Sequence, residues 1–214
     1  PSFQDPLPLR LLRDELGIDA DVATPAGVTR ALPPLVSLVV GGFVAQAVCT
    51  GLLLSAFGVS GASAGLAVAA QWSVALTVGF FVAICTGLPG YWFHAVVLGV
   101  SPPAWRIAVE LVRVQAVGSV VLAAVLPLWV AGCLAVRLLG GSLPESLLIA
   151  GNTLPLMCAL PGMFGLSRSF ARMAVHRGVA WPRSVAWMLT GWWGVAFLCT
   201  TPFTVLRLLR VLGA

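Results

Sequence analysis

The residues of this chain that could bind or transfer a small molecule are few, and side-chain amides are prominent among them. Four amides fall within long apolar stretches: Gln46, Gln71, Gln115 and Asn152. Together they could line a polar pocket for a transported molecule. They could instead hydrogen-bond one membrane helix to the next, at about 0.6 kcal/mol for each bond, and the sequence favours this simpler role.

Two histidines, His94 and His176, could ligate a haem or a chlorophyll. A ligand of this kind would have to face the interior of a helix bundle, whereas both residues lie beside arginine or aromatic residues at predicted helix ends. His94 is the better candidate, because Trp92 and Phe93 could flank a macrocycle. We expect no metal site and no cofactor other than lipid, with haem or chlorophyll at His94 as the alternative.

Charged residues precede the third apolar stretch rather than interrupting it. Arg106, Glu110 and Arg113 share one helical face at spacings of four and three, so Glu110 is expected to pair with both arginines. Pumps and ion-coupled transporters keep ionisable groups inside the membrane, and no predicted span has one in its middle third. The sequence also contains no nucleophile arrangement, phosphate-binding loop or paired carboxylates. We predict that the protein is not an enzyme.

A second group of charges lies in residues 167–183, which contain four arginines and no acid. We interpret this segment as a cytoplasmic loop. Its arginines are Arg168, Arg172, Arg177 and Arg183. They are expected to meet anionic headgroups or an acidic partner, at about 1 kcal/mol for each arginine near the bilayer. No nucleic-acid partner is implied, because the basic residues flank apolar spans.

These residues belong to a chain of 214 residues that is 59% hydrophobic and 9% charged, with a mean hydropathy of +1.02. Soluble domains contain about 25% charged residues, so the composition indicates an all-α, polytopic transmembrane helix bundle. Five stretches approach or exceed the roughly 20 residues needed to cross a bilayer. The predicted spans are residues 35–57, 64–88, 114–136, 147–166 and 185–206. Residues 1–32 form a polar segment with a short amphipathic helix, and residues 33–214 form the membrane domain.

The arginines indicate the orientation of the chain. With the N-terminus in the cytoplasm, nine of the 12 arginines fall on the inner side and three on the outer side, as the positive-inside rule requires. No cleaved signal peptide is expected, because the first apolar run begins only at Leu35 and lacks a small-residue cleavage site. We therefore expect an integral protein of the bacterial inner membrane.

The joint between the second and third spans, residues 88–101, is predicted to organise the contacts of the protein. Pro89 and Gly90 are expected to end the helix, and the aromatic run that follows is expected at the membrane interface. Trp92 or Phe93 should contact a neighbouring span or partner subunit, while Tyr91 places its hydroxyl in the polar layer. The predicted contact surface comprises Tyr91, Trp92, Phe93, Arg106 and Glu110.

This joint, together with the five-span plan, resembles the bacterial members of the Yip family, which are small five-span membrane proteins with a cytoplasmic N-terminus. The matching residues are Leu88, Pro89, Tyr91, Phe93, Leu98, Gly99 and Arg106. Hydropathy extends the resemblance over residues 35–206, but the acidic motif that precedes the first span of eukaryotic members is absent. The resemblance implies membrane organisation or partner binding and provides no catalytic residues.

The sequence therefore favours a non-enzymatic accessory or structural subunit that packs against other integral membrane proteins. Eight tryptophans, many small residues and the lack of charge at span centres suit packing better than transport. A small transporter or channel that uses the four amides is the alternative. A subunit that binds haem or chlorophyll through His94 is a third interpretation.

Overall fold

The computed structural model describes residues 25–57, 62–140 and 153–212, and every regular element in these ranges is helical. The long helices are α3 (Pro25–Ala56), α4 (Ala62–Val97), α5 (Ala104–Leu138), α7 (Leu160–His176) and α8 (Pro182–Leu212). The predicted all-α class is thus confirmed for the described residues. Most of the predicted polar segment, residues 1–32, lies outside them, and its last eight residues belong to α3.

Four helices are long and apolar enough to cross a membrane: α3, α4, α5 and α8. They correspond to the predicted spans 35–57, 64–88, 114–136 and 185–206, but the helices are longer. At 1.5 Å per residue, the 36 residues of α4 measure about 54 Å, against about 30 Å for the hydrocarbon core. A helix of this length, placed across a membrane, would extend beyond the hydrocarbon core into the headgroup region.

The predicted span 147–166 is not one continuous helix. Residues 147–152 lie outside the described part of the chain, residues 153–157 form a short helix, and residues 158 and 159 form a turn before α7. Pro161 lies in the first turn of α7, where a missing N–H breaks no helical hydrogen bond. α7 then continues to His176, so the prediction of a loop over residues 167–183 is wrong for its first ten residues.

The predicted helix end at Pro89 and Gly90 is also wrong, because α4 continues through both residues to Val97. A two-residue turn follows the helix and ends at Gly99, whose φ of +82° is readily adopted only by glycine. There the N–H of Gly99 donates to Val96 and that of Val100 donates to Ala95, which satisfies the last carbonyl groups of the helix. An internal proline is tolerated where neighbouring helices compensate the lost bond.

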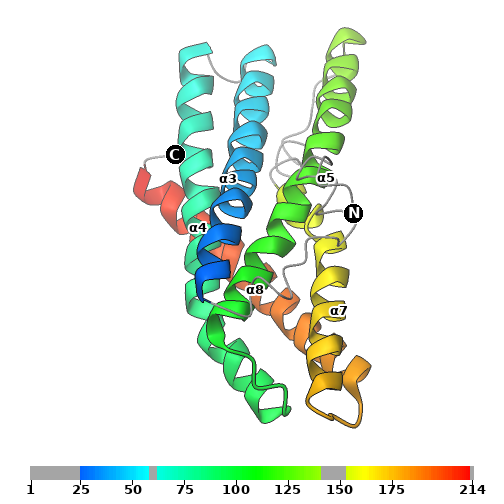
Figure 1. Cartoon of the computed structure of the whole chain (residues 1–214). Coiled ribbons are helices and arrows are strands. Elements are labelled where there is room, and N and C mark those ends of the chain that lie inside the picture. Colours follow the sequence, from blue (N-terminus) through cyan, green and yellow to red (C-terminus); the bar gives the residue numbers. More distant parts are fainter. Residues whose placement is uncertain (1–24, 58–61, 141–152, 213–214) are drawn as a thin grey trace.

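The helices alternate in direction, as Figure 1 shows. α3 packs against α4 and α5, α5 packs against α7, and α8 runs obliquely across the bundle and contacts α4 and α7. The start of α3, the end of α4, the start of α5, the end of α7 and the start of α8 lie in the same half of the bundle (Figure 1). We name it the arginine-rich half, because these segments carry Arg30, Arg106, Arg113, Arg168, Arg172, Arg177 and Arg183.

A row of six aromatic rings connects four helices through the core. Its members in order are Phe43 of α3, Phe80 of α4, Phe197 and Trp193 of α8, Tyr91 of α4 and Phe170 of α7. Successive ring centroids are 5.5–5.9 Å apart, and all but one pair meet edge to face. Such pairs contribute about 0.5–1.5 kcal/mol beyond area burial. The row fixes the packing of α7 and α8 against α4.

Candidate functional site

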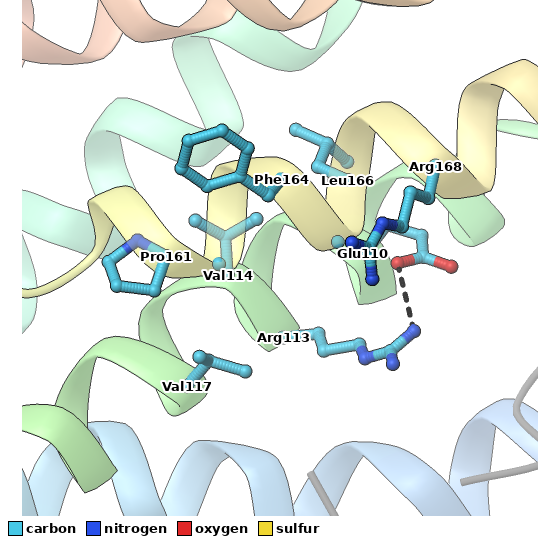
Figure 2. A pocket seen from close by; sticks show the side chains of 10 residues that line it. Glu110, Arg113, Val114, Val117, Pro161, Phe164, Leu166 and Arg168 are labelled. Carbon is cyan, nitrogen blue, oxygen red and sulfur yellow. Dashed lines mark ion pairs between the residues drawn. The ribbon is translucent and has the colours of Figure 1, made fainter. Parts of the chain in front are cut away.

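A cavity of about 350 Å³ lies between α5 and α7 in the arginine-rich half. Its charged lining residues are Glu110, Arg113 and Arg168, and its apolar lining includes Val114, Val117, Pro161 and Phe164. Figure 2 shows the three charged side chains on one side of the cavity, with Pro161 and Val117 on the other. The cavity thus has one charged end and one apolar end.

Two close backbone contacts, one to α7 and one to the turn before it, place α5 and α7 around this cavity. A Cβ atom at Gly162 would meet the carbonyl oxygen of Val114 and lie 2.8 Å from its Cα atom. A Cβ atom at Gly118 would lie 2.8 Å from the Cα atom of Ala159. In both places the neighbour is backbone, which cannot move aside, so only glycine permits this separation. The separation of α5 and α7 at the charged end is therefore fixed by backbone contacts.

The carboxylate of Glu110 is the centre of the charged end. Glu110 is 1% exposed and Arg113 is 5% exposed, and the Arg113 Nη1 to Glu110 Oε2 distance is 3.6 Å. The Ser169 hydroxyl of α7 donates a hydrogen bond of 2.8 Å to Glu110 Oε1. A buried charge is tolerated when it is both paired and hydrogen-bonded, and Glu110 meets both conditions. The prediction that Glu110 pairs with two arginines is confirmed for Arg113.

Positive charge exceeds negative charge around the cavity. Two arginines and one glutamate line it, which gives a formal charge of +1. Arg172, one turn beyond Arg168 on α7, adds a further positive charge near Arg113. An anion at the charged end would interact favourably with these arginines. The electrostatics of the site therefore favour a negatively charged ligand.

The aromatic residues of the predicted contact surface are arranged differently from the prediction. Tyr91 is buried in the aromatic row, whereas Trp92 and Phe93 are 42% and 60% exposed. The prediction that the Tyr91 hydroxyl lies in the polar layer is wrong, because α4 continues through Pro89 and turns Tyr91, like Ala95 one turn later, toward the core. The Trp92 indole N–H donates to the carbonyl of Pro102 at 3.0 Å.

The three predicted amides that the structure describes do not line this cavity. Gln46 is fully buried on α3 and its amide nitrogen lies 3.5 Å from the Thr50 hydroxyl. Gln115 of α5 donates to the carbonyl of Pro155 at 3.2 Å, which ties α5 to the segment before α7. Gln71 is half-buried on α4, and Asn152 lies outside the described residues. The bond from Gln115 is of the helix-to-helix kind that the sequence favours.

His94, the predicted haem or chlorophyll ligand, is half-buried near the end of α4. Its Nδ1 atom lies 2.6 Å from the carbonyl oxygen of Gly90, and its ring centroid lies 4.9 Å from that of Trp192. Among the residues that the structure describes, no three histidine, cysteine or acidic side chains gather as metal ligands. Cofactor binding at His94 stays a prediction.

The four arginines predicted to meet lipid or a partner are exposed. Arg168 and Arg172 lie on α7, Arg177 follows its last residue, and Arg183 lies in the first turn of α8. Arg168 is the member of this group that lines the cavity.

Comparison with known proteins found no family model, no curated protein and no solved structure that matches this chain. The resemblance to the Yip family therefore stays a prediction.

Proposed function

We propose that this chain is a non-enzymatic integral membrane protein that acts as an accessory subunit and packs against the transmembrane helices of other membrane proteins. The supporting observation is a groove of about 280 Å³ between α3 and α5. Its lining includes Ser37, Gly41, Gly42 and Ala45 of α3 and Ser119 and Ala123 of α5. Membrane helices associate through small residues of this kind, because lipid supplies no hydrophobic drive and backbones must approach closely.

The groove has a closed floor and an open mouth. At its floor, Gly42 meets Ser119, so closely that a Cβ atom at Gly42 would lie 2.5 Å from the serine Oγ atom. At its mouth, Gly41, Ala45 and Ala123 are exposed, and a Cβ atom at Gly41 would have no neighbour within 4 Å. A helix from another subunit can therefore lie against Gly41 without displacing any part of this chain.

The first test fills the groove. In Gly41→Leu, the new side chain should occupy the space of the partner helix and reduce co-purification of other integral subunits from native membranes severalfold. Gly132→Leu on α5 is the matched control, because Gly132 is also an exposed helical glycine with nothing within 4 Å of its Cβ position. Both variants should insert and fold, since a Cβ atom at either position has no neighbour within 4 Å.

Two outcomes would contradict the proposal. The first is that Gly41→Leu retains the same partners, in the same amounts, as Gly132→Leu. The second is that the wild-type chain purifies from native membranes only as an isolated monomer or a symmetric oligomer of itself, which would favour the transporter or channel alternative.

A further inference from the structure

We propose that the cavity between α5 and α7 binds the phosphate group of an anionic phospholipid, with Arg113 and Arg168 as the phosphate ligands. The site is separate from the groove between α3 and α5, and neither proposal depends on the other. Three features of the cavity support it: a buried and ordered arginine at its charged end, an excess of positive charge, and an apolar wall that includes an exposed phenylalanine.

The charged end is held in place before any ligand arrives. Arg113 is 5% exposed and its guanidinium lies 3.6 Å from Glu110, whose other oxygen accepts a hydrogen bond from Ser169. The Ser169 bond crosses from α7 to α5, and the glycine contacts beside it fix the separation of the two helices. A ligand that binds here meets an arginine that is already ordered, so little side-chain entropy is lost on binding.

The charge of the cavity selects the sign of the ligand. Arg113 and Arg168 outnumber Glu110, and Arg172 adds a further positive charge beside Arg113. The planar guanidinium fork matches two phosphate oxygens at once, which a lysine cannot do. Both arginines lie in the arginine-rich half, the end that the positive-inside rule places beside the anionic cytoplasmic leaflet. A phosphate is therefore the ligand group that this end fits best.

The apolar wall indicates that the phosphate belongs to a lipid. Val114, Val117 and Pro161 line the cavity, and Phe164 both lines it and is 56% exposed on the outer face of the bundle. At about 350 Å³ the cavity is near the lower end of the roughly 300–1,000 Å³ typical of ligand sites. It has room for a headgroup and the beginning of a chain, while the remaining methylenes lie along Phe164.

The test is native mass spectrometry of the full chain in detergent, titrated with phosphatidylglycerol, with phosphatidylcholine of the same acyl chains, or with inorganic phosphate. Phosphatidylglycerol should bind at the lowest concentration and should saturate at one tightly bound molecule. Arg168→Gln should weaken this binding about fivefold, which is the effect of losing one arginine contact near a bilayer. Arg177→Gln removes the same charge just beyond the end of α7, outside the cavity lining, and should leave binding unchanged.

A second variant tests the buried arginine without leaving a buried charge unpaired. The double substitution Glu110→Gln with Arg113→Gln replaces the ion pair by two neutral amides, and it should abolish the tight phosphatidylglycerol site while circular dichroism shows an unchanged helix content. Arg168→Lys should bind better than Arg168→Gln and less well than wild type, because it restores the charge without the fork.

The proposal is overturned by any of three results. Equal loss in Arg168→Gln and Arg177→Gln would mean that binding reflects overall charge. Equal affinity for phosphatidylglycerol and phosphatidylcholine would mean that the cavity does not recognise an anion. Full occupancy by inorganic phosphate, without preference for the lipid, would assign the site to free phosphate.

Discussion

The burial of Tyr91 depends on where the helix that carries it ends. Its ring lies between Phe170 and Trp193, with centroid distances of 5.5 and 5.9 Å, and its hydroxyl is buried without a hydrogen-bond partner among the described residues. The local sequence, an aromatic run after a proline and a glycine, is typical of a membrane interface. Burial of Tyr91 could not be predicted from that pattern, because it follows from the continuation of α4 and from contacts with α7 and α8.

Two substitutions at Tyr91 distinguish the effect of its ring on stability from the effect of its hydroxyl. Tyr91→Phe keeps the aromatic row and removes an unsatisfied polar atom, so it should raise the free energy of unfolding by about 1 kcal/mol. Tyr91→Ala removes the ring and should lower that free energy by about 3–5 kcal/mol. The melting temperatures of both variants, measured in the same detergent micelle, distinguish the two effects. A loss of stability in Tyr91→Phe would show that the hydroxyl has a partner.

Glu110 and Ser169 mark the limit of sequence-based prediction at this site. The spacing of three predicted the ion pair between Glu110 and Arg113, because neighbouring turns of one helix bring these side chains together. The bond from Ser169 joins residues 59 positions apart, and a serine within an apolar and basic stretch gives no signal for it. Non-local partners of this kind are found from the packing of helices, not from periodicity.

At the scale of the helices, hydropathy predicted the apolar centres of four long helices better than it predicted where those helices end. Apolar runs identify the centres of α3, α4, α5 and α8. The ends differ because charged residues such as Glu110 can continue a helix when a neighbouring helix supplies partners. A proline does not by itself show whether a helix ends, because neighbouring helices can compensate the lost hydrogen bond. Pro89 lies inside α4, whereas Pro161 lies at the start of α7.

The crossing of α5 and α7 can be tested with two glycines of the same helix. Gly162→Ala places a methyl group against the backbone of Val114 and should lower the free energy of unfolding by about 1–3 kcal/mol. Gly165→Ala, one turn later, meets nothing within 4 Å and should raise it by about 0.5–1 kcal/mol, since alanine favours the helix. Thermal unfolding in detergent measures both. Equal effects of the two substitutions would contradict the close crossing.

At the scale of the whole molecule, the alternating helices bring arginines from four helices, far apart in the sequence, into one half of the bundle (Figure 1). The sequence predicted this asymmetry by counting arginines, and the alternation of the described helices agrees with it. Arg137, near the end of α5, lies at the opposite end of that helix from Arg106. Both proposals require this arrangement to be embedded in a membrane, and the lipid site also requires the arginine-rich half to face the anionic cytoplasmic leaflet.

Cysteine labelling in intact cells tests this arrangement most directly. In a background with the five native cysteines replaced, Leu139→Cys at the end of α5 and Arg177→Cys at the end of α7 report on opposite ends of the bundle. Both residues are exposed, so a membrane-impermeant maleimide has access to either side chain. We predict that Leu139→Cys is labelled in intact cells and that Arg177→Cys is labelled only after permeabilisation. Labelling of Arg177→Cys in intact cells, or of both positions from the same side, would contradict the predicted orientation of the bundle in the membrane.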